Sequence, residues 1–337
     1  MRKADHTESR RCLDKLSFVF YAFFCGYPFV FAQTTDLTDL RARFLEVSGP
    51  IIDESKRCPL DPQEIERESF AEYTRTKLTI QVEPGDRLPF YLLTPNNLTA
   101  PASAMLCLHP TNPHGKLVVL GLGNEPNRNY AVELAQRSYI TLAPDYPGFG
   151  DYKPDAYAMG YASATAKGVW NHIRCIDYLQ SLPNVDPARI GCIGHSLGGH
   201  NTLFLGLFDE RVKLLVTSCG FTSFAKYYGG DLTGWSHKGY MPRIADIYGK
   251  DPAKMPWDFP QLLAALAPRP VFINAPLHDE NFEVSGVRDC VEFAKSAYGL
   301  VAETNLVTVH PDCGHDFPPD VREQSYKFID RALRMNR

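Results

Sequence analysis

The chain has 337 residues, of which 44% are hydrophobic and 22% are charged, and its formal charge at pH 7 is −4. This composition is typical of a globular protein and excludes collagen, coiled coil and intrinsic disorder. The slightly acidic balance argues against a nucleic-acid-binding protein, because such proteins usually carry a basic excess. The length allows one large domain or two medium ones with a substantial buried core.

Residues 1–32 have the pattern of a secretory signal peptide. Basic residues are frequent in residues 1–15, and an uncharged apolar run follows over residues 16–32. The run ends in Val30-Phe31-Ala32, so small or medium residues stand at the −3 and −1 positions of a cut before Gln33. This pattern predicts cleavage and export to a secreted or periplasmic location. The run is at the short limit for a membrane span, so a membrane anchor formed by the uncleaved signal is the alternative.

The nine cysteines have neither the spacing of a disulfide framework nor that of a zinc site. Cys12 and Cys25 lie in the predicted signal peptide. Cys107, Cys192 and Cys219 lie in apolar, strand-like runs, where we expect buried free thiols. Nothing in the sequence implies a metal ion or an organic cofactor.

A lead-in over residues 33–74 precedes the main domain. Within it, residues 36–47 have the spacing of a short amphipathic helix, and residues 48–70 form a polar, proline-containing stretch. We expect two strands next, over 77–82 and 88–93. They flank Glu83-Pro84-Gly85-Asp86, and Pro-Gly between alternating runs indicates a hairpin.

Apolar strand runs and helical patterns then alternate to the end of the chain. The expected order is strand 105–109, helix 129–137, strand 139–144, helix 164–182 with Ser163 as N-cap, strand 189–194, helix 199–206, strand 212–218, strand 271–274, helix 287–297, strand 307–310 and helix 321–335. Such alternation predicts an α/β fold with a mostly parallel twisted sheet covered by helices on both faces. We expect one domain over residues 75–337, with the antiparallel hairpin at one edge.

The alternation is interrupted between residues 221 and 260 by a segment rich in aromatic and turn-forming residues. A structureless loop of this length is improbable in a compact domain, so we expect a small cap with short helices. It should lie over the carboxyl ends of the strands, where open α/β sheets bind ligands. Trp235, Tyr240 and Arg243 are its candidate pocket residues. The competing interpretation is that the aromatic residues form only a local core.

One strand-to-helix junction carries the pattern G-x-S-x-G. It reads Gly194-His195-Ser196-Leu197-Gly198, with an apolar strand before it and a helical segment after it. A serine on such a sharp turn has a strained backbone and a hydroxyl that projects from the sheet, and the glycines let strand and helix pass closely. Ser196 is therefore the candidate nucleophile.

A serine nucleophile needs a base, and the base needs an acid that orients it. Asp279 follows strand 271–274, and His315 follows strand 307–310 in a Gly-His turn, so both stand at strand ends. His310 is a poorer base because it still lies within its strand. Glu280 is the immediate competitor of Asp279 as the orienting acid.

Acyl transfer also requires hydrogen-bond donors for the oxyanion that develops on the substrate. The amide of Leu197, directly after the nucleophile, is one candidate. The second should come from the loop after strand 105–109. Because Pro110 has no N–H, Thr111 is the first residue in that loop that can donate.

These features resemble the α/β-hydrolase superfamily over residues 75–335. The turn Asp145-Tyr146-Pro147-Gly148-Phe149-Gly150 is similar to the superfamily's D-x-x-G-x-G turn. The leading hairpin, L-H-P-T-N-x-x-G-K at 108–116 and A-P-R-P-V-F-I-N at 267–274 are most similar to the dienelactone hydrolase and acetyl xylan esterase branch. The chain departs from that branch in two places. Dienelactone hydrolases proper use a cysteine where Ser196 stands, and His109-Pro110 replaces the common His-Gly.

The resemblance implies a serine hydrolase with Ser196, Asp279 and His315 as its triad and without a cofactor. We expect the substrate to be a small-molecule or carbohydrate ester with a short acyl group, and the partners to include neither nucleic acid nor membrane. A prolyl oligopeptidase-like peptidase and a non-catalytic binding protein are the alternatives. Such peptidases usually carry a large extra domain, and an intact triad counts against a protein that has lost catalysis.

Overall fold

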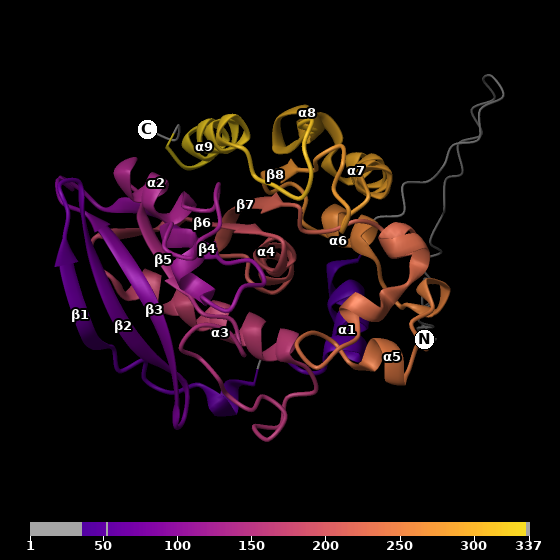
Figure 1. Ribbon diagram of the computed structural model, residues 1–337, viewed down its shortest axis with the longest axis horizontal. Coiled ribbons are helices and arrows are strands. Elements are labelled where there is room, and N and C mark those ends of the chain that lie inside the picture. The colour runs from indigo at the N-terminus through magenta and orange to yellow at the C-terminus, as the bar shows by residue number, and fades with distance from the viewer. Residues whose placement is uncertain (1–35, 52, 335–337) are drawn as a thin grey trace, which may run out of the picture. The chain divides into compact units, whose positions relative to one another are not determined.

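The computed structural model describes residues 36–51 and 53–334, and these residues form a nine-stranded sheet (Figure 1). The strands are β1 (Gln63–Ser69), β2 (Tyr73–Glu83), β3 (Asp86–Pro95), β4 (Ala102–Leu108), β5 (Ile140–Pro144), β6 (Val185–His195), β7 (Val212–Ser218), β8 (Val271–Asn274) and β9 (Leu306–Val309). Their order across the sheet is β1-β2-β3-β5-β4-β6-β7-β8-β9. The predicted signal peptide lies outside the described residues.

The sheet is parallel from β5 through β9 and antiparallel at its other edge. Strands β1, β2 and β3 pair antiparallel with one another, and β3 pairs antiparallel with β5. The remaining pairs, from β5–β4 to β8–β9, are parallel. From β4 the chain passes to β5 on one side and later to β6 on the other, which creates a topological switch point where such sheets bind ligands. The predicted fold class is confirmed.

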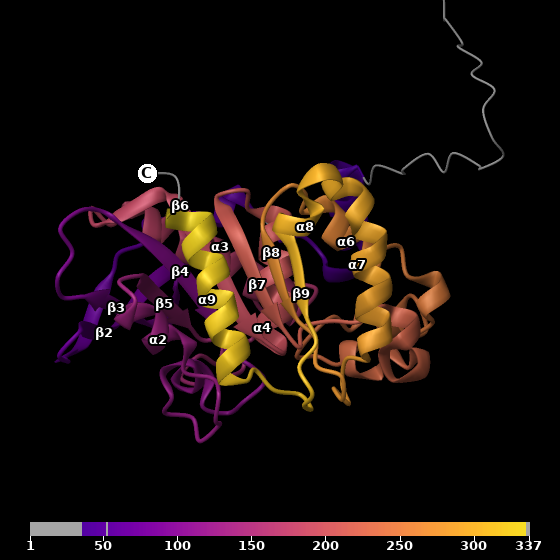
Figure 2. The ribbon, with the colours of Figure 1, turned by 90° about the horizontal axis from the view of Figure 1, so that it is seen from above.

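Helices cover both faces of the sheet (Figure 2). They are α1 (Leu37–Ser48), α2 (Tyr130–Gln136), α3 (Ala164–Ser181), α4 (Leu197–Phe208), α5 (Arg243–Asp246), α6 (Phe259–Ala265), α7 (Val284–Tyr298), α8 (Ala302–Asn305) and α9 (Pro319–Arg334). Helices α2 and α9 bury apolar side chains against one face, and α9 lies along β7 and β6. Helices α3 and α4 cover the other face, with α1 and α6 packed against α4.

The long helix α3 shows how local sequence signals set an element. It begins directly after Ser163, whose side chain accepts a hydrogen bond from the amide of Ala166, as expected for an N-cap. Its interior is buried almost throughout, and Trp170 is fully buried and donates from its indole nitrogen to the carbonyl of Val82. This contact ties α3 to the hairpin strand β2.

Strand β1 was not among the expected strands, because the sequence indicated only a polar, proline-containing stretch over residues 48–70. All seven residues of Gln63–Ser69 are exposed, so the strand has no apolar face that the sequence could reveal. It forms because the edge of β2 offers unpaired backbone groups, and β1 pairs with it from Gln63 to Ser69.

The segment between β7 and β8 contains several short helical turns. They are η3 (Phe224–Gly230), η4 (Leu232–Trp235), α5, η5 (Pro252–Lys254) and the start of α6. Asp258 connects them: it caps α6 through the amide of Phe259, and its carboxylate also accepts from the amide of Phe224 at 3.0 Å. One side chain thus fixes the beginning of η3 and that of α6.

Candidate active site

Ser196 lies at the sharp turn between β6 and α4. Its φ of 54° and ψ of −116° place it in a region that non-glycine residues rarely adopt. The turn is held by hydrogen bonds in both directions. The Ser196 amide donates to the carbonyl of Ser218 at 2.8 Å, and its own carbonyl accepts from the amide of Gly199 at 2.8 Å. Such maintained strain is characteristic of functional positions.

The glycines of the turn are required by close backbone contacts. A Cβ on Gly194 would lie 2.2 Å from the carbonyl carbon of Gly198, and a Cβ on Gly198 would lie 2.2 Å from the carbonyl oxygen of Leu108. No real Cβ tolerates such distances. Helix α4 can therefore start directly against β6 and β4 only because both positions lack side chains.

Asp279 and His315 form a hydrogen-bonded pair after β8 and β9. The His315 Nδ1 lies 2.9 Å from Asp279 Oδ1 and 3.0 Å from Oδ2, and the amides of Asn281 and Phe282 donate to Oδ1. Burial opposes ionisation of Asp279, but the His315 hydrogen bond and charge, with the two amides, outweigh it and lower the pKa of Asp279. An ionised carboxylate can only accept, so Nδ1 carries the proton and Nε2 is left free to act as a base.

The His315 ring stands beside the turn that carries Ser196. Its centroid is 4.8 Å from that of His195, the residue directly before Ser196. His195 is itself buried and hydrogen-bonded through Nδ1 to the Ser218 hydroxyl at 2.9 Å. The structure thus brings the three candidate triad residues to the same edge of the sheet, the carboxyl ends of β6, β8 and β9.

Glu280 and the two carboxylates near His315 in the sequence, Asp312 and Asp316, have other surroundings. Glu280 is exposed. Asp312 lies 2.8 Å from His278 Nε2, and both side chains are exposed. Asp316 forms an ion pair with Arg128 at 2.6 Å. The carboxylate that contacts the His315 ring is that of Asp279.

The two candidate oxyanion donors lie on different loops. The Leu197 amide is at the first position of α4, where a helix offers its amides no internal acceptor. Thr111 follows β4 and is exposed. Both residues follow strand ends, those of β4 and β6, and their role as oxyanion donors stays a prediction.

His109 has a role that sequence reasoning missed. Its Nε2 accepts from the backbone amide of Tyr146 at 2.9 Å, and an amide can only donate. Its Nδ1 must then carry the proton, which it donates to the carbonyl of Pro110 at 2.6 Å. In a planar trans peptide the carbonyl of Pro110 and the N–H of Thr111 point in opposite directions. His109 therefore fixes the direction of the Thr111 N–H, and burial favours this neutral ring by lowering the pKa of His109.

Asp145 holds the same loop from below. Its fully buried carboxylate accepts from the Lys116 amide at 2.8 Å, the Lys116 ammonium at 2.6 Å and the Asp151 amide at 3.0 Å. A Cβ on Gly115 or on Gly150 would lie 2.2 Å from Asp145 Oδ1. These contacts explain why glycines stand at 115 and 150 and a lysine at 116. Their backbone and side-chain groups surround the Asp145 carboxylate and hold the loop that carries Thr111.

The three candidate pocket residues have different surroundings. Trp235 is 2% exposed. Its ring packs against those of His200, Phe224, Phe259 and Phe282. Arg243 donates to the carbonyl of Glu46 at the end of α1. Tyr240 is half-buried, and its hydroxyl lies 3.0 Å from the Thr111 hydroxyl. Tyr240 is thus the candidate that contacts the loop of the site.

One cluster of described residues has the ligand types of a metal site. The potential ligand atoms of His195, Cys219 and His315 lie within 4.8 Å of one another. A metal would need the thiolate of Cys219, but burial and the nearby Asp279 raise the pKa of this thiol well above its ordinary value. His315 already binds Asp279. The cluster therefore fits a hydrogen-bonded catalytic site better than a metal centre, and the seven described cysteines are all free.

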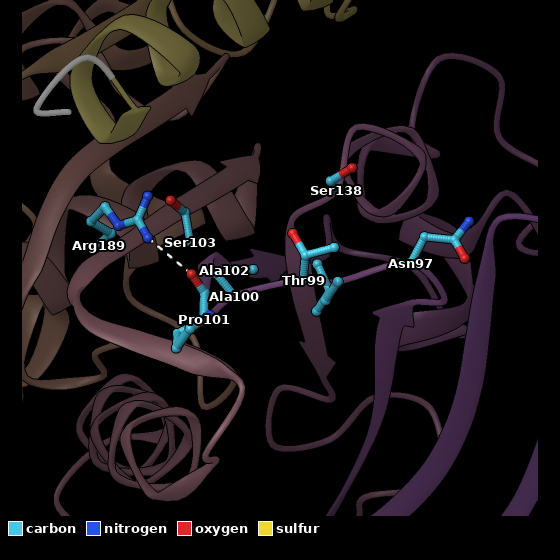
Figure 3. Close-up of a pocket in the computed structure, with 9 residues that line it drawn as sticks. Asn97, Thr99, Ala100, Pro101, Ala102, Ser103, Ser138 and Arg189 are labelled. Carbon is cyan, nitrogen blue, oxygen red and sulfur yellow. Dashed lines mark hydrogen bonds between the residues drawn. The ribbon is translucent and has the colours of Figure 1, made fainter.

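A surface pocket lies beside the first residues of β4 (Figure 3). It is lined by the loop 97–101, the first residues of β4, Ser138 and Arg189, whose guanidinium donates to the carbonyl of Pro101 at 2.9 Å. It adjoins the amino ends of β4 and β6, whereas Ser196 follows the carboxyl end of β6. We therefore do not associate this pocket with the triad residues.

Comparisons with known proteins agree with the geometry. Residues 154–302 match the family described as glucuronyl esterase of fungi. The protein YtaP of Bacillus subtilis is 24% identical over 292 residues, which cover 82% of this chain and 94% of that protein.

Solved structures share the fold over most of the chain. A glucuronoyl esterase from Solibacter usitatus superposes with a TM-score of 0.70 at 19% identity, covering 87% of this chain and 91% of that one. An acetyl xylan esterase from Paenibacillus sp. R4 has a TM-score of 0.62 at 19% identity, covering 89% and 95%. These likenesses confirm the expected resemblance to the acetyl xylan esterase group at the level of fold.

Proposed function

We propose that this protein, a member of the α/β-hydrolase superfamily, hydrolyses carboxylic esters through an acyl-enzyme formed on Ser196. The observation that carries the proposal is the Asp279–His315 pair beside the strained turn of Ser196. Nucleophile, base and orienting acid, each on its own strand end, are the parts that acyl transfer to a serine requires.

In the first half of the reaction the Ser196 hydroxyl attacks the ester carbonyl carbon while its proton passes to His315 Nε2. The carbonyl electron pair moves to oxygen, where the amides of Leu197 and Thr111 stabilise the negative charge. The carbon–oxygen bond to the alcohol then breaks, and the alcohol leaves with the proton from His315. Asp279 keeps the ring in the required tautomer and stabilises the imidazolium.

In the second half a water molecule takes the place of the alcohol. His315 removes its proton, the resulting hydroxide attacks the acyl carbon, and the same amides stabilise the second oxyanion. When the bond to Ser196 breaks, the serine oxygen recovers the proton from His315 and the carboxylic acid leaves. Water and ester are thus converted to acid and alcohol without an external reactant.

The substrate class that we propose is an ester linked to a carbohydrate, with a short acyl group such as acetyl or with an esterified uronic acid. The support comes from the matched family and from the names of the structural relatives, which are glucuronoyl and acetyl xylan esterases. The peptidase alternative rests on a shorter match: dipeptidyl-peptidase 5 of Porphyromonas gingivalis is 26% identical over 106 residues, which cover 30% of this chain, whereas the two esterase structures superpose over 87% and 89% of it.

The proposed nucleophile is tested by Ser196→Ala and by a fluorophosphonate probe. The variant should lose hydrolysis of p-nitrophenyl acetate with little change in thermal midpoint, because the hydroxyl serves catalysis rather than packing. The probe should label Ser196 in the wild type, and His315→Ala should suppress labelling. His310→Gln is the matched control, since among the described residues the His310 side chain hydrogen-bonds the carbonyl of Ala275 and no triad residue. Full activity of Ser196→Ala would refute the proposal.

We further propose that residues 1–32 are a signal peptide cleaved before Gln33. In the described residues no helix combines the length and apolarity needed to cross a membrane. Expression in a host with an export pathway should yield a soluble extracytoplasmic protein. Its intact mass should equal that of a chain that starts at Gln33. A full-length chain in the membrane fraction would instead support the uncleaved anchor.

A further inference from the structure

Tyr240 reaches from the segment between β7 and β8 to the loop that carries a proposed oxyanion donor. Its hydroxyl lies 3.0 Å from the Thr111 side-chain hydroxyl. Tyr240 also packs against the cluster formed by Tyr146, Ala164 and Leu197. The phenol is thus associated with both residues whose amides we assign to the oxyanion, Thr111 by a hydrogen bond and the Leu197 cluster by packing.

The ring of Tyr240 is held from several sides. Its centroid is 4.6 Å from that of His237, 5.5 Å from that of His200 and 5.9 Å from that of Trp235. Its carbonyl also accepts from the amide of Thr165. A ring confined in this way can move its hydroxyl little, so the hydroxyl is positioned before a substrate arrives.

The hydroxyl pair leaves one hydrogen-bond donor unused. Tyr240 and Thr111 each carry one O–H, and the bond between them uses only one of the two protons. Neither hydroxyl has another hydrogen-bond partner among the residues that the structure describes. Burial raises the pKa of the Tyr240 phenol, so the hydroxyl keeps its proton and remains a donor at neutral pH.

We propose that the Tyr240 hydroxyl is a third donor to the oxyanion, beside the amides of Leu197 and Thr111. In the free enzyme it is paired with the Thr111 hydroxyl, and in the transition state it donates to the carbonyl oxygen that becomes negative. The inference rests on the proposed ester hydrolysis at Ser196. On this proposal, the segment 221–260 contributes a catalytic group, the Tyr240 hydroxyl, in addition to covering the site.

The test compares Tyr240→Phe with Tyr157→Phe. Tyr157 is a matched control because its hydroxyl donates to the carbonyl of Lys238, in the segment 221–260, and not to Thr111. With p-nitrophenyl acetate, Tyr240→Phe should lower kcat by about 10- to 100-fold with KM nearly unchanged, since a lost oxyanion donor acts in the transition state. Its thermal midpoint should match that of Tyr157→Phe, which should keep the wild-type kcat.

Thr111→Val separates a direct role of Tyr240 from a positioning role. If the phenol only holds the Thr111 side chain, the two variants should lose equal activity. If it donates to the oxyanion, Thr111→Val should lose much less, because the phenol and the Thr111 amide both remain. Equal losses, a change confined to KM, or no loss in Tyr240→Phe would each overturn the proposal.

The rate of fluorophosphonate labelling keeps this test independent of the substrate. The phosphonyl oxygen of the probe occupies the oxyanion position as Ser196 reacts, so Tyr240→Phe should slow labelling as it slows hydrolysis. If the wild type is not labelled at Ser196 at all, the proposed function fails. If labelling is rapid and equal in wild type and Tyr240→Phe, ester chemistry stands and only the third donor is refuted.

Discussion

Asp279 and Glu280 are adjacent carboxylates, and their backbone settings separate them. Asp279 accepts hydrogen bonds from two backbone amides and is paired with His315, whereas Glu280 is exposed. From the sequence, Asp279 could be preferred to Glu280 only by its position after the expected strand 271–274. The structure adds the amides that fix the Asp279 carboxylate toward the ring.

Asp279→Asn should lower kcat by at least about 100-fold, because an amide can present its NH₂ group to Nδ1 and stabilise the wrong tautomer; loss of the equivalent acid in the chymotrypsin-type triad costs about 10⁴-fold. Glu280→Gln should keep kcat within about threefold of the wild-type value, because Glu280 is exposed and does not contact His315. Steady-state kinetics with p-nitrophenyl acetate measures both. The opposite ranking would show that Glu280 orients His315.

His109 offers a test of how the Thr111 amide is oriented. His109→Phe removes both the donor to the Pro110 carbonyl and the acceptor for the Tyr146 amide, so the peptide can turn away from the site. We expect kcat to fall by about 10-fold or more. His109→Gln retains a donor and an acceptor in one amide and should restore part of the rate. Equal rates in both variants would show that these hydrogen bonds do not orient the donor.

The candidate triad could be predicted because each member has a local signal. Ser196 lies in a glycine-bounded turn, and Asp279 and His315 follow apolar strands. His109 and Asp145 could not be assigned in this way. His109 accepts from the amide of Tyr146, 37 residues away, and Asp145 pairs with Lys116, 29 residues away, and only the fold brings these residues together.

At the scale of elements, the strands with buried faces were predictable and the exposed ones were not. Strands β7 and β8 have the bounds expected from their apolar runs. Strand β1 has no buried residue, and its sequence carries no alternation. Helix α6 was also missed, because its start depends on the capping box of Asp258 and Gln261 within an aromatic-rich segment.

The ionisation of Asp258 should make the folding stability depend on pH. Burial raises its pKa to about 6, against the backbone hydrogen bonds from Phe259 and Phe224 that lower it. The folded protein therefore holds this proton more tightly than the unfolded chain, so the contribution of Asp258 to stability falls as the pH rises from about 4 to about 6.

Asp258→Asn keeps an oxygen that can accept from the two amides but cannot ionise. The difference in unfolding free energy between variant and wild type should shift by about 2 kcal/mol in favour of the variant between pH 4 and pH 7. Urea unfolding at the two pH values measures it. Asp251→Asn, at the N-cap of η5, is the control, because Asp251 is more exposed. A constant difference for Asp258→Asn would contradict the assigned shift.

At the scale of the whole described fold, aromatic rings join the segment 221–260 to the sheet. Trp235 packs against His200 of α4, Phe259 of α6 and Phe282, which lies in the loop between β8 and α7. The segment and the α/β core therefore share one buried cluster. We infer that they unfold together rather than as separate units.

Trp235→Ala should lower the unfolding free energy by about 3–5 kcal/mol, because it empties a large buried site. Near- and far-ultraviolet circular dichroism should still report one coincident transition. Tyr228→Ala is the control, since the Tyr228 side chain is 57% exposed and should contribute little to the core. Two separate transitions would mean that the segment and the core unfold independently. An unchanged stability with an altered substrate preference would mean that Trp235 lines a pocket.

The same packing bears on the size of the acyl group. The ring centroids of His200 and Phe282 lie 4.7 and 6.2 Å from that of Trp235, and that of Tyr240 lies 5.9 Å from it, so aromatic side chains crowd the region beside Tyr240. We therefore expect kcat/KM for acetyl and propionyl p-nitrophenyl esters to exceed that for octanoyl and longer esters. Because one methylene is worth only about 1–3 kcal/mol, the preference should be graded rather than absolute. Rates that rise steadily toward dodecanoyl esters would instead indicate an open, lipase-like groove.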